Sequence, residues 1–255
     1  MIAPRAALIR LTATASVAMS FACHKPSEDR VTQAPEHSQH DHGHGHGHHH
    51  GDGEVNEHGY KGHRFDDPKQ WTQQFESPER TAWQKPDEVV ASLALAPDAT
   101  IADLGAGTGY FAIRFAAAAP QGKVYAVDIE PNMVAWLAQR GEDQGLANLE
   151  AVQAEPDDPR LPEAVDLVFM CNVFHHLADP KAYFEAVAGK LEPGGRVVIV
   201  DFRKDNPEHA PGPPAAMRME AEEIIELMRA AGYELRRDDR ELLEWQYLLE
   251  FTRAG

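Results

Sequence analysis

Short apolar runs alternate with stretches in which apolar residues recur every three or four positions along residues 95–255. The first pattern is typical of strands and the second of helices, so their alternation predicts an α/β fold with a mostly parallel sheet. The nearly continuous apolar run at 165–171 is typical of a strand covered on both faces. We predict strands at 100–104, 123–128, 149–153, 165–171, 196–202, 233–237 and 245–251, and helices at 86–95, 109–119, 131–140, 180–191 and 221–231.

The first 63 residues differ in composition and predict two further parts. Residues 1–23 contain Arg5 and Arg10, then an uncharged stretch of small and apolar residues that ends at Cys23. This arrangement resembles a bacterial export signal with a lipobox, in which the cysteine receives a lipid anchor. The alternative is a disordered extension or a misplaced start. The first interpretation places the protein in the cell envelope, and the second places it in the cytoplasm.

Residues 24–63 form a low-complexity segment with only four apolar side chains, too few to offset the entropy of ordering. This predicted tether holds 11 of the 14 histidines. Imidazoles at this density bind Zn, Ni or Cu, so one interpretation is a metal-buffering tether, and the other is a solvated spacer. The candidate ligands are His42, His44, His46, His48, His49 and His50.

Residues 64–255 carry the predicted fold, with an N-terminal lid at 64–95. The chain has a formal net charge of −17, and 34 acidic against 19 basic side chains fall in this domain. Such an excess of acid disfavours nucleic acid and anionic lipid as partners, because their phosphates attract basic surfaces. The membrane is therefore expected to be a partner only through the N-terminal anchor. Two cysteines cannot form a disulfide scaffold.

The segment 101–110 contains closely spaced glycines between a predicted strand and a predicted helix, as a nucleotide-binding loop requires. Dinucleotide-binding loops have the pattern Gly-x-Gly-x-x-Gly, whereas here the glycines are Gly105, Gly107 and Gly109. Asp103 precedes them, and a carboxylate there suits a cofactor with an ammonium group better than a pyrophosphate. Asp128 ends the next strand, where a carboxylate can accept hydrogen bonds from ribose hydroxyls.

These motifs together resemble the class I S-adenosylmethionine (SAM)-dependent methyltransferases, in their small Rossmann-like form, over about 80–252. The resemblance implies SAM as cofactor and a seven-stranded sheet of order 3-2-1-4-5-7-6 with the seventh strand antiparallel and helices on both faces. It also implies that Asn172 borders the methionyl part of SAM and that the segment 154–157 meets the adenine, with Glu155 as the candidate acid. The implied cofactor-binding residues are Asp103, Gly105, Ala106, Gly107, Gly109, Asp128, Ile129, Glu155 and Asn172.

Methyl transfer from a sulfonium is an in-line displacement that depends mainly on positioning, and a base is needed only if the nucleophile must lose a proton. His175 and His176 follow the fourth strand and are the candidate bases, although either histidine can equally serve to hold its loop. Cys171 is more typical of a small buried hydrophobe than of a ligand. Asp201 ends the fifth strand and is either a residue of the acceptor side or a solvated loop acid.

The sequence therefore predicts a SAM-dependent methyltransferase that acts on a small molecule, with acceptor specificity set by residues 64–85 and 203–219. An exported metal-binding protein with a non-catalytic Rossmann-like domain is the alternative. The complete motif set disfavours that alternative, since a remnant would tolerate losses there. An NAD-dependent oxidoreductase is disfavoured by Asp103 and by Tyr110, which stands where the dinucleotide pattern has its third glycine.

Overall fold

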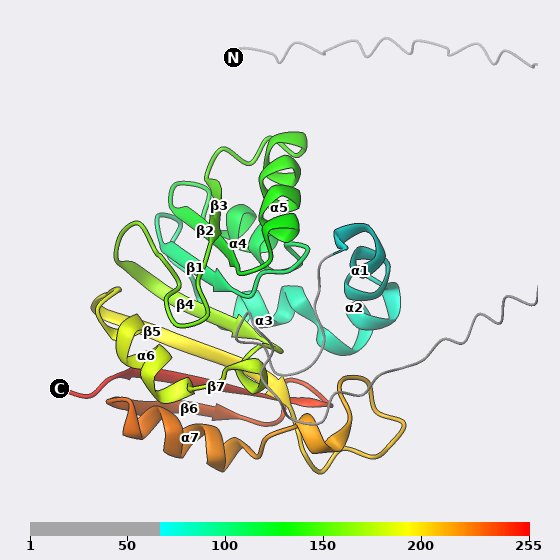
Figure 1. Ribbon diagram of the computed structural model, residues 1–255, viewed down its shortest axis with the longest axis vertical. Coiled ribbons are helices and arrows are strands. Elements are labelled where there is room, and N and C mark those ends of the chain that lie inside the picture. Colours follow the sequence, from blue (N-terminus) through cyan, green and yellow to red (C-terminus); the bar gives the residue numbers. More distant parts are fainter. Residues whose placement is uncertain (1–66) are drawn as a thin grey trace, which may run out of the picture. The chain divides into compact units, whose positions relative to one another are not determined.

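A computed structural model describes residues 67–255 (Figure 1). The predicted export signal, the tether and its six candidate metal ligands lie outside the described residues and stay predictions. Within the described part, strands alternate with helices along the chain, and the strands join into one sheet. None of the helices in this part is long and apolar enough to cross a membrane.

The sheet confirms the predicted order, β3-β2-β1-β4-β5-β7-β6. The first five strands of the chain pair in parallel, and β7 pairs antiparallel with both β5 and β6. A parallel sheet of this kind needs helices on its faces, which the alternating sequence supplies. The strands are β1 Thr100–Leu104, β2 Lys123–Asp128, β3 Leu149–Gln153, β4 Val165–Cys171, β5 Leu191–Phe202, β6 Tyr233–Asp239 and β7 Gln246–Arg253.

Two apolar cores lie on the opposite faces of the sheet. One core joins strand residues to α3, α4 and Leu137 of α5, and the other joins them to α6 and α7. Successive residues of β4, such as Phe169 and Met170, belong to different cores, which confirms that this strand is covered on both faces. The helices are α1 Pro68–Phe75, α2 Pro78–Gln84, α3 Pro86–Ser92, α4 Ala112–Ala118, α5 Pro131–Asp143, α6 Pro180–Ala188 and α7 Ala221–Ala230, with 3₁₀ turns η1 at Phe174–His176 and η2 at Ala215–Met217.

Most boundaries of the helices and of the last three strands differ from the prediction by one to five residues, and two of these differences have a clear physical reason. Helix α4 begins three residues later than expected, because Gly109 has a left-handed φ of 93° that cannot continue into a helix. Strand β5 begins at Leu191, five residues before the predicted start at 196, and so includes Gly194 and Gly195. The register with β4 shifts at this point, from Val165 opposite Leu191 to Leu167 opposite Arg196. The two glycines therefore occupy an irregularity within the strand.

The described part of the predicted N-terminal lid, residues 67–95, contains three short helices, and the first two lie where we predicted no helix. Each of the first two helices begins with a proline in its first turn, preceded by a side-chain cap from Asp67 or Ser77. Lys85 then adopts a left-handed conformation (φ 46°), which ends α2 and turns the chain into α3. Capping rather than apolar periodicity defines these helices, which is why the apolar pattern does not reveal them.

Candidate active site

The carboxyl ends of β1, β2 and β4 bring three of the predicted site residues to one edge of the sheet. Asp103 lies next to the end of β1, Asp128 ends β2, and Asn172 follows β4. Ligands of open α/β sheets bind at this edge, where adjacent strands continue to opposite faces. The topology thus places the predicted residues together, although they are up to 69 positions apart in the chain.

The loop after β1 depends on its glycines. Gly105, Gly107 and Gly109 all have left-handed φ angles, of 70°, 56° and 93°. A Cβ atom at Gly105 would lie 2.4 Å from Cγ2 of Val173, in the loop after β4. The backbone N–H groups of Gly105 and Ala106 donate to the carbonyl of Val127 at 2.8 and 2.9 Å. The loop is therefore held against both neighbouring strands, and a side chain at Gly105 would disturb it.

Asp128 is buried beside this loop and holds it through backbone contacts. Its carboxylate accepts hydrogen bonds from the N–H of Gly107 at 2.8 Å and from the N–H of Glu130 at 3.0 Å. Burial raises the pKa of Asp128 to about 6, although these backbone donors act in the opposite direction. Each carboxylate oxygen can accept further hydrogen bonds, so Asp128 can serve the loop and a ligand together. Ile129 follows it and is half-buried.

Asp103 is a buried acid in this site, with 3% of its surface exposed. Burial raises its pKa to about 8, a backbone hydrogen bond from Ala112 opposes the shift, and Asp128 adds to it. Among the described residues, no basic side chain forms an ion pair with Asp103, and Arg80 is the cation whose charge acts on it. A buried carboxyl of this kind favours a ligand that brings a positive charge.

The predicted histidines lie on the turn η1, and His175 is paired with Asp201. Nδ1 of His175 lies 2.9 and 3.0 Å from the two carboxylate oxygens of Asp201, and both side chains are buried. Of the two alternatives for Asp201, the solvated loop acid is wrong, since its side chain is 1% exposed. A carboxylate beside Nδ1 favours the tautomer with its proton on Nδ1, in which Nε2 is an acceptor. The ring of His176 packs on His175 with centroids 4.2 Å apart.

Glu155 lies at the edge of the site and not within it. The backbone N–H of Ala154 donates to the carbonyl of Asp128 at 2.9 Å, which places this segment beside the predicted ribose acid. The Glu155 side chain is exposed and forms an ion pair with Arg160 at 2.8 Å. It would have to leave that ion pair before it could contact a ligand.

Cys171 behaves as the sequence indicated. It packs against the apolar core on the α4 face of the sheet. Burial raises the pKa of its thiol to about 12, so the thiolate is not populated near neutral pH. Within residues 67–255, no group of three or more His, Cys, Asp or Glu side chains is arranged to hold a metal ion.

Three polar residues at this edge were not predicted. Arg80 and Gln84 come from α2, and Gln246 begins β7. Both glutamines are fully buried, and a hydrogen bond joins them across 162 positions of sequence. The only sign of them in the sequence is that a glutamine occupies a position where a buried residue is usually apolar. Such a signal does not say which partner the residue meets.

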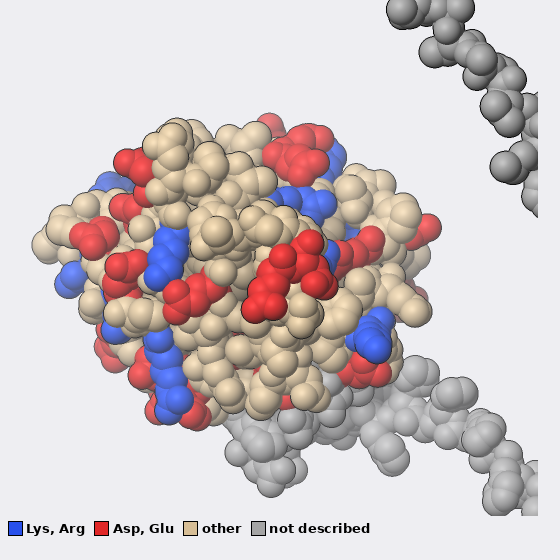
Figure 2. All heavy atoms as spheres, turned by 90° about the horizontal axis from the view of Figure 1, so that it is seen from above, with Lys and Arg blue, Asp and Glu red and all other residues tan. Residues whose placement is uncertain are grey.

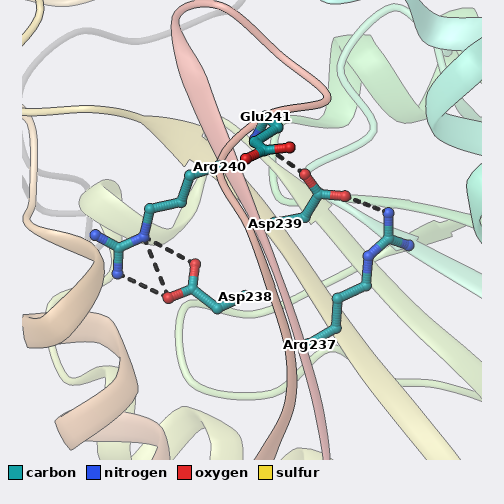
Figure 3. A pocket seen from close by; sticks show the side chains of 5 residues that line it. All are labelled: Arg237, Asp238, Asp239, Arg240 and Glu241. Carbon is teal, nitrogen blue, oxygen red and sulfur yellow. Dashed lines mark hydrogen bonds and ion pairs between the residues drawn. The ribbon is translucent and has the colours of Figure 1, made fainter.

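A separate hollow lies at the β6–β7 hairpin, lined by residues 237–241 (Figure 3). Arg240 donates to Asp238 at 2.8 Å, and Arg237 is paired with Asp239. Because both arginines are neutralised by their neighbours, this hollow presents no unpaired cation to a ligand. It is not a second candidate site.

Comparisons with known proteins agree with this geometry. Residues 102–197 match the family described as "Methyltransferase domain". The chain is 32% identical over 171 residues to trans-aconitate 2-methyltransferase of Azoarcus sp. (strain BH72), covering 64% of this chain and 66% of that protein. It is 31% identical over 102 residues to a tRNA U34 carboxymethyltransferase of Desulfotalea psychrophila, covering 39% of this chain and 31% of that protein.

A solved SAM-dependent methyltransferase from Aquifex aeolicus has the same fold. Its TM-score is 0.67 at 24% identity, and the match covers 74% of this chain and 99% of that one. The sheet order is that of the Rossmann-like methyltransferase fold, and the family match identifies residues 102–197 as a methyltransferase domain. The chain spans about a third of the length of the carboxymethyltransferase and 66% of the trans-aconitate enzyme. The methyl acceptors of these relatives therefore do not identify the acceptor of this chain.

Proposed function

We propose that the protein transfers the methyl group of SAM to a small-molecule acceptor at the carboxyl edge of its sheet. The observation that carries this proposal is the pairing of two buried acids, Asp103 and Asp128, with a glycine loop whose backbone is accessible at Gly105 and Gly107. A cofactor with an ammonium group and a ribose matches both acids. A pyrophosphate would bring negative charge to Asp103 and does not match.

The proposed roles follow from position. Asp103 faces the ammonium group, Asp128 accepts from the ribose hydroxyls, and the loop 105–109 lies against the cofactor. Asn172 lies beside its methionyl part, while Ile129 and the segment of Glu155 line the adenine side. SAM, when bound, supplies an already activated methyl group, so the protein's main contribution is alignment of the acceptor.

His175 is the residue best placed to act as a base. Asp201 holds its Nδ1 proton and would stabilise the charged imidazolium, which is how a buried carboxylate supports a histidine base. His176 packs against the same ring. A carboxylate acceptor would need no base, and in that case the pair would hold the turn after β4. His175→Asn distinguishes these roles. If His175 is a base, the variant should transfer methyl groups more slowly to acceptors that must lose a proton, and the loss of rate should depend on pH. If His175 only holds the turn, the loss should not depend on the protonation of the acceptor.

A small acceptor is favoured over nucleic acid by charge. Basic and acidic side chains are mixed on the face shown in Figure 2, and no continuous basic surface crosses it. The whole chain carries a formal charge of −17, which repels phosphate backbones. One relative is named for trans-aconitate and another for tRNA, so both acceptor classes belong in the first screen.

The test is calorimetric titration of the full chain with SAM and with S-adenosylhomocysteine (SAH), with NAD as the control. Micromolar binding of SAM and SAH without NAD binding is the expected result. Release of SAH in the presence of trans-aconitate or other small carboxylates would then identify the acceptor class. Binding of NAD in place of SAM would contradict the proposal.

The export signal and the histidine tether add a separate proposal about location and metal. An envelope protein would need SAM delivered from the cytoplasm, and the tether would buffer Zn, Ni or Cu there. Fractionation of cells that express the full chain, with a Cys23→Ser control for lipidation, tests the first point. Zn titration of the full chain against a variant without residues 40–50 tests the second.

A further inference from the structure

Four polar side chains form one continuous chain of hydrogen bonds from the lid to the end of β4. Nε of Arg80 donates to Oε1 of Gln84 at 3.2 Å. Nε2 of Gln84 then donates to Oε1 of Gln246, and Nε2 of Gln246 donates to Oδ1 of Asn172. The two glutamines have no exposed surface, so water cannot replace these bonds. We call this set of four residues the amide relay.

The amide relay has a direction, and arginine sets it. A guanidinium group has donors only, so Gln84 must turn its oxygen towards Arg80 and its nitrogen towards Gln246. Gln246 therefore accepts from Gln84 with its oxygen and donates with its nitrogen to Oδ1 of Asn172. Asn172 keeps its Nδ2 group as a donor, and its side chain is half-buried, not enclosed. No partner for Nδ2 is found among residues 67–255.

Asn172 is placed to present that donor to the site. Its backbone adopts a left-handed conformation (φ 61°) directly after β4, while its N–H still donates to the carbonyl of Val200 at 2.9 Å. The next residue, Val173, lies against Gly105 of the glycine loop. Asn172 therefore adjoins the glycine loop, while Asp103, near the end of β1 just before this loop, supplies the opposite chemistry of a hydrogen-bond acceptor.

We propose that Gln84 and Gln246 are positioning residues that hold the Asn172 amide with its N–H₂ group towards the ligand. The inference rests on the proposed function. The group of the ligand beside Asn172 must then be a hydrogen-bond acceptor. For a ligand with an amino-acid end, this orientation places the carboxylate at Asn172 and leaves the ammonium for Asp103. Through Gln84, the lid thereby determines which kind of ligand group can bind beside Asn172.

The alternative is that the amide relay only clamps α2 onto the sheet. A clamp would affect the binding of all ligands equally, because it would act through lid stability. A positioning role affects only ligands that carry the acceptor group. The two roles are separated by comparing SAH with its decarboxylated analogue, which keeps the adenosine and the amine but lacks the carboxylate.

Gln84→Glu is the decisive variant, because it reverses the amide relay without removing a heavy atom from its packing. The carboxylate introduced at this position still accepts from Arg80, which neutralises the new charge, but it has no N–H to give to Gln246. Gln246 then donates to that carboxylate and accepts from Asn172, so the oxygen of Asn172 faces the ligand. Gln246→Glu also forces Asn172 to turn, and it provides a second variant if the first does not fold.

Both ligands are titrated calorimetrically into the full-length wild type and both variants. Loss of one hydrogen bond to a charged group of a ligand lowers the affinity for that ligand by roughly tenfold or more. We expect the wild type to prefer SAH over the decarboxylated analogue, and the preference to fall by about tenfold in Gln84→Glu and Gln246→Glu. Gln74→Glu, which adds the same charge at an exposed position of the lid, should keep the wild-type ratio.

The outcomes separate the two levels of inference. A wild type that binds neither ligand contradicts the proposed function. A wild type that binds SAH, with variants that lose affinity for both ligands in parallel, shows a clamp and overturns the positioning role. An unchanged ratio in folded variants overturns it as well. A selective loss of the preference for the carboxylate supports it.

Discussion

The proposed site has two halves, one for the cofactor and one for the acceptor, and they are built in different ways. The cofactor half comprises the glycine loop and the carboxyl ends of β1, β2 and β4, and its contacts follow strand register or span few residues, such as the 21 positions between Gly107 and Asp128. The acceptor half comprises α1, α2, the loop 203–219 and the β6–β7 hairpin. Its contacts join distant segments, such as Lys85 and Leu242, which are 157 positions apart.

The acceptor half is also lined by a different kind of side chain. Trp83 of α2 packs on Phe202 at the end of β5, with ring centroids 5.6 Å apart, and Gly212 lies against the same phenylalanine ring. Arg218 is buried in this loop and donates to the carbonyl of Pro213 at 2.8 Å. The cofactor half depends on backbone conformation and buried acids, whereas the acceptor half depends on packing between segments. Substitutions in the first half should therefore change cofactor binding far more.

Asp128→Ala tests the cofactor half most strongly. The alanine side chain cannot accept the two hydrogen bonds proposed from the ribose hydroxyls, and each such bond to a charged group contributes about 1.5–3 kcal/mol. The substitution would also leave the N–H of Gly107 without its acceptor. We expect SAH affinity to fall by about 100-fold or more. Calorimetry measures the loss, and circular dichroism confirms that the domain stays folded. Unchanged affinity would show that Asp128 only holds the loop and would contradict its role at the ribose.

Asp103→Asn should separate binding from stability. The folded-state pKa of about 8 exceeds the usual 3.8, so the folded state holds a proton that the unfolded state loses between these values. The acid therefore lowers the free energy of unfolding as pH rises from about 4 to 8. We expect Asn to stabilise the unliganded protein by about 3 kcal/mol at pH 8 and little at pH 4, while weakening SAH binding about tenfold. Thermal melts at both pH values check the stability difference.

The same acid predicts proton release on binding. An ammonium group beside Asp103 would lower the pKa of that carboxyl, so wild-type SAH binding at pH 7 should release up to one proton. Affinity should then rise from pH 6 to 8, by at most about tenfold per pH unit. Calorimetry in two buffers with different ionisation enthalpies measures the protons. Equal release by Asp103→Asn would assign the proton to another group.

Glu76→Gln tests the connection between the two halves. Arg140 is paired with both carboxylate oxygens of Glu76, at the end of α1, and donates to the carbonyl of Thr108 in the glycine loop at 2.6 Å. Because this paired charge is half-buried, its loss should lower the unfolding free energy by about 1–2 kcal/mol and SAH affinity a few-fold. Glu185→Gln, which breaks an exposed pair with Lys181, is the matched control and should cost under about 0.5 kcal/mol.

The sequence predicted the cofactor half because short motifs determine it. The strands at 100–104, 123–128, 149–153 and 165–171 match their predicted limits, and the glycine spacing identifies the loop between two of them. Strand topology then brings Asp103, Asp128 and Asn172 together without further information. What the sequence reveals here is a local pattern, and local patterns determine backbone conformation.

The contacts between distant segments in the proposed acceptor half were not predicted, for the opposite reason. The amide relay requires that Gln84 of the lid meet Gln246 of β7, and no local pattern indicates which buried polar residues will pair. The pairing of His175 with Asp201 likewise depends on adjacent strand ends rather than on spacing, so it left two roles open for each residue. The fold could be derived from periodicity and motifs, whereas these contacts required the packed structure.

His209→Ala has the smallest expected effect and defines the limit of the comparison. His209 is exposed on the loop 203–219, and its ring meets Trp245 edge-on with centroids 6.1 Å apart. Its loss should change the unfolding free energy by under about 0.5 kcal/mol, as for most exposed positions. SAH affinity should stay the same, because this contact lies wholly within the acceptor half. A measurable fall in SAH affinity would show that the loop 203–219 contributes to the cofactor site, and the division into two halves would no longer hold.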